Sequence, residues 1–312
     1  MENVIECRGL VKRFGKVVAL NGLTLEVPRK HIFGLIGPNG AGKTTTIRIC
    51  LGLLRPDAGE AFLFGEDPWN NPRVRLRVGV LHERMALPEH VRAAEFLEHV
   101  ARIYGLSSPE EAAAEALEFV GLKEAADRKV GGLSAGMRQR LCIAQALIHR
   151  SEFVIADEPM ANLDPLGRSE MLDLIARLHR EEGVDFLISS HILPELSRVC
   201  DSVAFIHQGR VYITGRLEEL MRRYGRAFRV STDKPEALRP KVAELPYVRE
   251  AFVAGRDLMV EVEEGHEAEF YTAISGLAKE LGVELYGVES KVASLEDLFK
   301  RVVLGELGGE RA

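Results

Sequence analysis

The chain has 312 residues, of which 46% are hydrophobic, and a formal net charge of −6. This length allows one large domain or two ordinary ones with buried cores. The acidic balance argues against a non-specific nucleic-acid binder, and no apolar run approaches the about 18 residues that cross a bilayer. The first residues show no basic segment followed by an apolar core, so we expect no signal peptide.

Apolar runs alternate with helical patterns through the first two thirds of the chain. Strands are expected at 5–10, 23–27, 32–36, 153–156 and 185–189, with a hairpin at 203–207 and 210–214. Helices are expected at 45–54, 92–104, 109–120, 137–148 and 165–182. This alternation predicts an α/β fold with a mostly parallel sheet covered by helices.

The pattern changes after about residue 225. Strands are expected at 228–232, 248–253, 258–263 and 283–288, and helices at 235–245, 267–281 and 295–303. The first six of these elements follow the order βαββαβ, which is typical of a ferredoxin-like α/β unit. This segment contains no catalytic constellation.

The four cysteines are scattered and form no Cys-x-x-Cys pair; they are Cys7, Cys50, Cys142 and Cys200. We expect small buried hydrophobic side chains in a reducing compartment, and neither disulfides nor metal ligands.

Residues 37–45 read Gly-Pro-Asn-Gly-Ala-Gly-Lys-Thr-Thr, directly after an apolar run. This is the phosphate-binding pattern Gly-x-x-x-x-Gly-Lys-[Ser/Thr] in a strand–loop–helix context, and the alternative is a glycine-rich turn that binds nothing. Backbone N–H groups and the helix N-terminus would face a nucleoside triphosphate. Lys43 is expected to reach the β- and γ-phosphates, and the Thr44 hydroxyl to bind Mg²⁺. The expected nucleotide contacts are Gly37, Pro38, Asn39, Gly40, Ala41, Gly42, Lys43, Thr44 and Thr45.

The apolar run 153–156 ends in two carboxylates, Asp157 and Glu158. Strand ends of this kind form ligand sites in open α/β sheets. Asp157 is expected to hold Mg²⁺, through water, and Glu158 to orient and deprotonate the attacking water. Taken alone, the pair also fits a solvated strand end, and the upstream phosphate loop favours the functional interpretation.

Between these motifs, residues 133–140 read Leu-Ser-Ala-Gly-Met-Arg-Gln-Arg. This segment resembles the signature motif (Leu-Ser-Gly-Gly-Gln) of ATP-binding-cassette (ABC) ATPases. Other family landmarks stand in the expected order: Phe14 at the adenine-stacking position, Asn-Leu-Asp ending at Asp164 at the D-loop, and His191 at the switch histidine.

The resemblance implies roles for these residues. Ser134 and Gly136 would meet the γ-phosphate bound to a second subunit, and Asp164 would contact the partner's phosphate loop. His191 would bind the γ-phosphate or hold Glu158 and the water, which makes Lys43, Glu158 and His191 the expected catalytic residues. Four of the family landmarks also have a simpler local interpretation. Ser134 and Asp164 could be helix caps, and His191 and Phe14 could be structural or exposed side chains.

The chain departs from the family pattern at three positions. Ala135 and Met137 replace Gly and Gln in the signature motif, and backbone donors survive both changes. Residues 78–83 align with a family loop whose last residue is usually Gln, a ligand of Mg²⁺ and water, and here it is Glu83. A carboxylate can take Mg²⁺ but adds negative charge beside the phosphates, so a metal ligand and a solvated loop residue both remain open for Glu83.

The resemblance implies the ABC ATPase fold over residues 1–222, with a mostly parallel sheet, an antiparallel β part and a helical subdomain at about 84–150. Residues 226–304 resemble the C-terminal extension of exporter ATPase subunits and are expected to form the smaller ferredoxin-like domain, followed by a tail at 305–312.

The implied function is an ATP- and Mg²⁺-dependent ATPase subunit of an ABC transporter, of the exporter type, on the cytoplasmic face of the cell membrane. Two such subunits, identical or not, would close head to tail on two ATP molecules and drive separate transmembrane permease chains, which residues 84–96 would face. The alternatives are a soluble ABC ATPase acting on ribosomes or nucleic acid, and a nucleotide sensor that does not hydrolyse ATP. Substrate specificity is expected to lie in the membrane chain.

Overall fold

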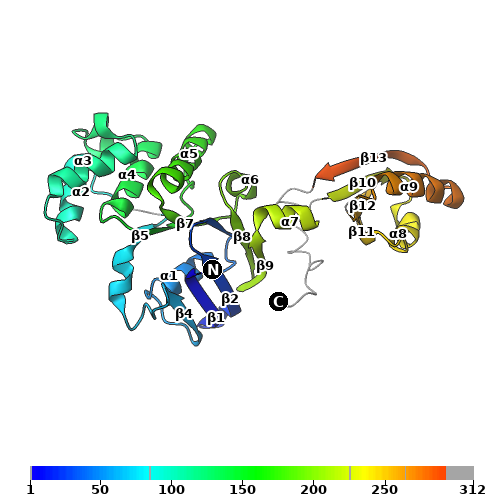
Figure 1. Cartoon of the computed structure of the whole chain (residues 1–312), viewed down its shortest axis with the longest axis horizontal. Coiled ribbons are helices and arrows are strands. Elements are labelled where there is room, and N and C mark those ends of the chain that lie inside the picture. The colour runs from blue at the N-terminus through cyan, green and yellow to red at the C-terminus, as the bar shows by residue number, and fades with distance from the viewer. Residues whose placement is uncertain (1, 84–85, 225, 264, 293–312) are drawn as a thin grey trace. The chain divides into compact units, whose positions relative to one another are not determined.

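The computed structural model describes residues 2–83, 86–224, 226–263 and 265–292. These residues divide into two compact units, one running to Arg216 and the other beginning at Leu217 (Figure 1).

The centre of the first unit is a six-stranded sheet in the order β5-β6-β7-β3-β8-β9. Its strands are β3 (Ile32–Ile36), β5 (Val78–Leu81), β6 (Phe153–Asp157), β7 (Asp185–Ser190), β8 (Ser202–His207) and β9 (Arg210–Arg216). All neighbours pair in parallel except β8 and β9, which form the expected hairpin. Every residue of β3, β6 and β7 is buried, as their continuous apolar runs predict.

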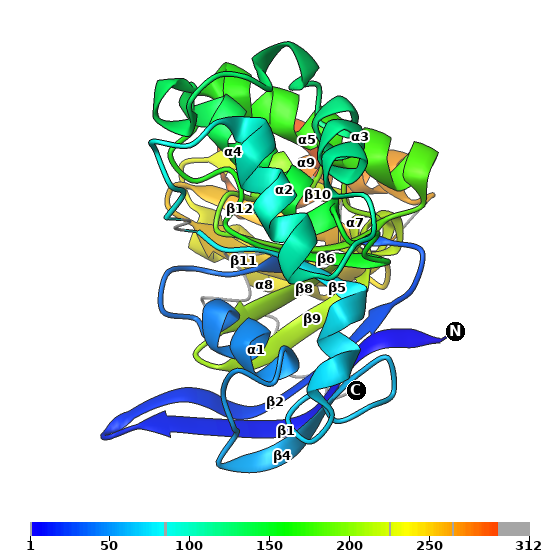
Figure 2. The same ribbon diagram turned by 90° about the vertical axis from the view of Figure 1, so that its left-hand side faces the viewer.

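A second, three-stranded antiparallel sheet has the order β2-β1-β4, formed by β1 (Asn3–Phe14), β2 (Val17–Pro28) and β4 (Ala58–Leu63). Helix α1 (Lys43–Cys50) lies between this sheet and the central one (Figure 2). The main core cluster fills the same space, with side chains from β1, β2, β3 and α1. The phosphate-loop helix is thus held from both sides.

Three expectations for this part were wrong. Strand β1 extends to Phe14 and strand β2 begins at Val17, because the hairpin continues to the turn at Gly15, whose φ is 58°. Helix α1 ends at Cys50 and not at residue 54, because Gly52 adopts the left-handed conformation (φ 61°) that terminates helices. Residues 78–81, aligned with a loop, form the edge strand β5.

Helices α2 (Ala93–Ile103), α3 (Pro109–Phe119) and α4 (Ala135–Leu147) pack together as a helical cluster (Figure 1). Helix α5 (Pro165–Glu182) contacts α4, and the short α6 (Leu193–Leu196) follows β7. Short 3₁₀ helices cover Pro72–Arg77, Lys123–Ala125 and Val130–Gly132. Within the described residues, no helix has both the length and the apolar character that crossing a bilayer requires.

The second unit begins with α7 (Leu217–Tyr224). It continues with β10 (Arg226–Thr232), α8 (Pro235–Ala243), β11 (Val248–Ala254), β12 (Asp257–Val262), α9 (Glu267–Leu281) and β13 (Leu285–Val292). The sheet order β11-β12-β10-β13, antiparallel throughout, is that of the ferredoxin-like unit and confirms the predicted βαββαβ order. The helix predicted at 295–303 lies outside the described residues.

This unit has a core of its own. Phe228 from β10 and Phe270 from α9 meet with ring centroids 4.7 Å apart, and both are fully buried. Leu238 and Val242 from α8 close the cluster against β12.

All four cysteines are buried free thiols, as predicted. Sγ of Cys7 lies 3.4 Å from Sγ of Cys50, where β1 meets α1. This hydrogen bond, together with burial, raises the pKa of Cys7 well above its usual value, and burial raises the pKa of Cys142 to about 12. Cys7 and Cys142 therefore remain neutral thiols at physiological pH.

Candidate nucleotide site

Three adjacent parallel strands, β3, β6 and β7, end at the same edge of the central sheet. The phosphate loop leaves β3 there, the carboxylates leave β6, and Ser189 to His191 leave β7. The N–H of Gly37 donates to the carbonyl of Ser190 at 3.2 Å, which ties the loop to β7. Chain segments more than a hundred residues apart therefore meet at one edge, the usual ligand position in such sheets.

The path of the phosphate loop depends on glycine at two positions. A Cβ at Gly37 would lie 2.2 Å from the carbonyl oxygen of Ile206. A Cβ at Gly42 would lie 2.8 Å from the carbonyl oxygen of Ala19, and Gly42 also has φ 111°. The loop therefore packs its backbone directly on β2 and β8, and its next residue begins α1 with free N–H groups aimed at the site.

Lys43 turns back over this loop. Its Nζ donates to the carbonyls of Gly37 at 2.7 Å and Pro38 at 3.3 Å. The same atom lies 3.1 Å from Oε1 of Glu158, an ion pair without the geometry of a directed hydrogen bond. The Lys43 side chain is only 6% exposed, so these contacts satisfy a nearly buried charge.

Thr44 and Asp157 form the second pair. Oγ1 of Thr44 donates to Oδ2 of Asp157 at 2.8 Å, and Oγ of Ser189 donates to Oδ1 at 2.5 Å. Asp157 is 3% exposed, so both carboxylate oxygens receive a donor inside the protein.

Glu158 occupies a strained position just after β6. Its φ is 51°, which is unusual for a residue with a Cβ. Its N–H donates to both Oγ and the carbonyl oxygen of Ser189, at 3.0 and 3.2 Å. Its carboxylate lies between Lys43 and Nδ1 of His191, which is 2.9 Å from Oε2. The geometry holds this carboxylate between two groups that can carry positive charge.

The donor set fits Mg²⁺. Thr44 and Asp157 present oxygen atoms only, and Mg²⁺ prefers oxygen, keeps several waters and takes few protein ligands when phosphates share it. Among the described residues, no group of three His, Cys, Asp or Glu side chains could hold a metal ion. Glu83 leaves the end of β5 with an exposed side chain.

The remaining predicted residues lie on other elements. Phe14 ends β1 with half of its surface exposed, and Nζ of Lys12 lies 5.8 Å from its ring centre. Ser134 caps α4 by accepting from N–H of Met137 at 3.2 Å, and Gly136 follows in the first turn. Asp164 caps α5 by accepting from N–H of Gly167 at 2.7 Å. The local capping interpretation therefore holds for both, and it leaves their surfaces open to a second molecule.

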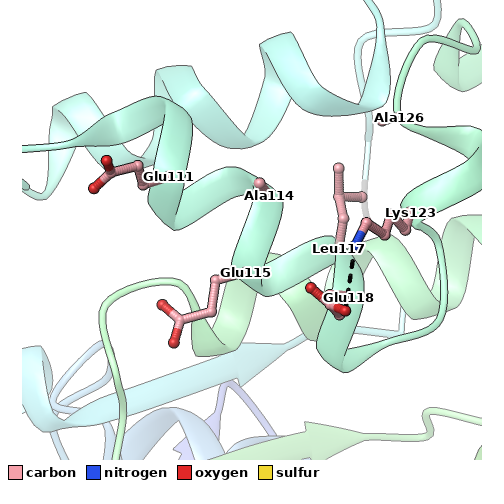
Figure 3. Close-up of a pocket in the computed structure, with 7 residues that line it drawn as sticks. All are labelled: Glu111, Ala114, Glu115, Leu117, Glu118, Lys123 and Ala126. Carbon is pink, nitrogen blue, oxygen red and sulfur yellow. Dashed lines mark hydrogen bonds and ion pairs between the residues drawn. The ribbon is translucent and has the colours of Figure 1, made fainter.

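A surface pocket lies elsewhere, along α3 (Figure 3). Its lining residues are Glu111, Ala114, Glu115, Leu117, Glu118, Lys123 and Ala126. Glu118 pairs with Lys123 at 3.3 Å and Glu115 pairs with Arg150, outside the lining, at 3.4 Å, so the lining itself holds three carboxylates and one cation. Such a surface repels phosphate, so this pocket is not the nucleotide site.

Ser189 was missed as a functional candidate from the sequence. It contacts the carboxylate of Asp157 and the backbone N–H of Glu158, yet the sequence shows only a serine that ends an apolar run two residues before His191. A hydroxyl at the end of an otherwise apolar buried strand was the available signal.

Comparison with known proteins finds relatives in sequence and in structure. The family model "ABC transporter" matches residues 20–161. The uncharacterized ABC transporter ATP-binding protein YxlF of Bacillus subtilis is 36% identical over 304 residues, covering 96% of this chain and 99% of that protein. The bacitracin transport ATP-binding protein BcrA of Enterococcus faecalis is 32% identical over 98% of both chains. A Nod factor export ATP-binding protein of Ralstonia nicotianae is 38% identical over 70% of this chain and 68% of its own length.

The solved structure of an ATP-binding subunit of an ABC transporter superposes with a TM-score of 0.62 at 31% identity, covering 71% of this chain and 93% of that one. These matches confirm the predicted fold class and the resemblance stated from the sequence. The chain therefore belongs to the ABC transporter family, as one of its ATP-binding, ATP-hydrolysing subunits.

Proposed function

We propose that two copies of this chain, or one copy and a paired subunit, close head to tail on two Mg·ATP and drive an exporter through separate membrane chains. The export direction is supported by the Nod factor export relative, and coverage of nearly the whole length of BcrA and YxlF supports a subunit of the same architecture. A location on the cytoplasmic face of the cell membrane follows from this role.

The observation that carries the proposal is the arrangement around Glu158. Lys43 contacts the carbonyl of Gly37 in its own loop and the carboxylate of Glu158. The β- and γ-phosphates offer Lys43 ionised oxygens, which attract its positive charge more strongly than two neutral carbonyls do. Nucleotide entry would thus draw Lys43 away and release Oε1 of Glu158 toward the attacking water.

The other residues position the substrate. Thr44 and Asp157 would hold Mg²⁺, which neutralises charge on the β- and γ-phosphate oxygens. His191 would keep Glu158 in place through Nδ1 and offer its other nitrogen to the γ-phosphate. Phe14 would stack on adenine, since half of its ring is exposed next to Lys12.

The second copy would complete the pocket. Ser134 and Gly136 sit at the N-terminus of α4, a thirteen-residue helix with no acidic residue in its first turn, which favours an incoming anion. Asp164 would reach the partner's phosphate loop from the start of α5. Closing would transmit ATP occupancy to a permease as a population shift between open and closed pairs.

Steady-state phosphate release by the full-length chain tests the proposed machinery. We expect Mg²⁺-dependent turnover that falls by about a thousandfold in Lys43→Ala, because one charged contact to the transferred phosphate is lost in a dry site. Turnover that persists in Lys43→Ala would contradict the assigned role of Lys43.

Affinity purification of the tagged chain from detergent-solubilised cells tests the partner. A co-purifying protein with several apolar spans is expected. Recovery with ribosomes instead would support the rival function in translation.

A further inference from the structure

We infer that Ser189 is a positioning residue for ATP hydrolysis, whose hydroxyl holds the carboxylate of Asp157 and the backbone of Glu158 at once. This inference rests on the roles proposed above for Asp157 and Glu158. It adds a third group, from a different strand, on which their geometry depends.

The position of Ser189 is set by the sheet. β7 lies between β6 and β3, and Ser189 pairs with Asp157 on one side and with Leu35 on the other. The residue is fully buried. A buried hydroxyl needs hydrogen-bond partners, and the partners of the Ser189 hydroxyl are Asp157 and Glu158.

The first partner is Asp157. Its two oxygens have separate donors, Thr44 on Oδ2 and Ser189 on Oδ1. If Thr44 and Asp157 hold Mg²⁺, the Thr44 hydroxyl would be shared with the ion, and the hydrogen bond from Ser189 to Oδ1 would remain to orient the Asp157 carboxylate.

The second partner is the backbone of Glu158. Its left-handed conformation is unfavourable for a glutamate and persists only when its surroundings hold it. The Glu158 N–H is shared between Oγ and the carbonyl oxygen of Ser189. One hydroxyl therefore donates to the first carboxylate and accepts from the residue that carries the second, so both shift together if it is lost.

The proposal predicts a specific defect in Ser189→Ala. Nucleotide affinity in EDTA should stay as in the wild type, because Lys43 and the loop amides are unchanged. The gain in affinity for a non-hydrolysable ATP analogue on adding Mg²⁺ should fall about tenfold, and kcat should fall about ten- to a hundredfold, as for other groups that orient a metal ligand. Calorimetric titration of the full-length chain with and without Mg²⁺ measures the first quantity, and phosphate release the second.

Ser151→Ala is the matched control. Ser151 is also a buried serine and donates to the carbonyl of Ala146 at 2.8 Å, but it precedes β6 at the opposite edge of the sheet. It should lower the melting temperature with no effect on the Mg²⁺-dependent gain. An Mg²⁺-dependent gain in Ser189→Ala equal to that of Ser151→Ala would overturn the inference.

Two further comparisons isolate the hydroxyl and the assumption beneath it. Ser189→Thr and Ser189→Val add nearly the same volume and differ in the hydroxyl, so the Thr variant should retain the Mg²⁺-dependent gain and the Val variant should lose it; equal behaviour would refute the role of the hydroxyl.

Asp157→Asn should lose the gain as well. If Asp157→Asn keeps it, the proposed metal role of Asp157 fails; if only Ser189→Ala keeps it, the metal role stands and the inference about Ser189 fails.

Discussion

Nζ of Lys43 lies 3.1 Å from Oε1 of Glu158, so the group expected to bind phosphate neutralises the group expected to activate water. Both side chains are nearly buried, at 6% and 13% exposure. Breaking such a pair without a substitute would leave uncompensated buried charge. An anionic ligand that replaced Glu158 at Lys43 would separate them at lower cost, so the proposed function would couple nucleotide arrival to release of the proposed base.

The sharing of each nucleotide pocket between two chains can be tested by mixing variants. A chain with Ser134→Ala keeps its Lys43, and a chain with Lys43→Ala keeps its Ser134. Each alone should be nearly inactive. A one-to-one mixture should recover part of the wild-type phosphate release, because a mixed dimer carries one intact site with Lys43 from one chain and Ser134 from the other. A mixture as inactive as its components would count against shared pockets.

Gly37→Ala tests the close packing of the phosphate loop. The new Cβ would lie 2.2 Å from the carbonyl oxygen of Ile206, so the loop has to move off β8. We expect a loss of about 1–3 kcal/mol in unfolding free energy and at least tenfold weaker ATP binding. Gly132→Ala is the control, because no atom lies within 4 Å of the added methyl; its unfolding free energy should change by less than about 0.5 kcal/mol. Equal effects of the two substitutions would show that contact with Ile206 is irrelevant.

His149 predicts a pH dependence of stability. Its ring stacks on Tyr104 with centroids 4.1 Å apart, and its Nε2 lies 3.3 Å from the carbonyl oxygen of Val78. Burial lowers the pKa of His149, an effect that its bond to Val78 only partly opposes. The unfolded chain therefore binds this proton more tightly, and stability should be full above the unfolded pKa of about 6.5 and fall as pH drops below it.

Chemical denaturation at pH 7.5 and pH 5.5 measures this effect. His149→Phe keeps the stacking and removes the titration, so its loss of unfolding free energy between the two pH values should be smaller than that of the wild type. An identical loss in both proteins would place the acid sensitivity elsewhere.

Phe228→Ala tests the independence of the second unit. Removing this buried ring from contact with Phe270 should destabilise that unit by about 3–5 kcal/mol. ATP binding by the first unit should be unchanged, as measured by calorimetry. Tyr286→Ala, at a position 68% exposed in the same sheet, should be nearly neutral. Loss of ATP binding in Phe228→Ala would show that the nucleotide site depends on this core.

Local patterns of residue types were enough to predict the phosphate loop, the two carboxylates at the end of β6 and the order of helices and strands in the second unit. Strand β5 was not, because it contains Gly79, a poor strand former. The structure explains this glycine: a Cβ there would lie 2.2 Å from the carbonyl oxygen of Ala146 in α4. Close packing of α4 on β5 thus overrides strand propensity.

The couplings within the site were equally hidden. The contacts of Ser189 with Asp157, and of Lys43 with Glu158, join residues 32 and 115 positions apart. They exist because β7 lies between β6 and β3, and strand order is a property of the whole sheet. The sequence could name the residues of the site, and only the fold shows which of them touch.

In the homodimeric form of the proposed function, ATP would hold two copies of this chain together through Lys43 of one and Ser134 of the other. Sedimentation velocity of full-length Glu158→Gln, with and without Mg·ATP, tests it most directly, because this variant should bind ATP without hydrolysing it. We predict a dimer with ATP and a monomer without it, and no dimer when Lys43→Ala is added. A Glu158→Gln protein that binds ATP tightly and still sediments as a monomer would contradict the account.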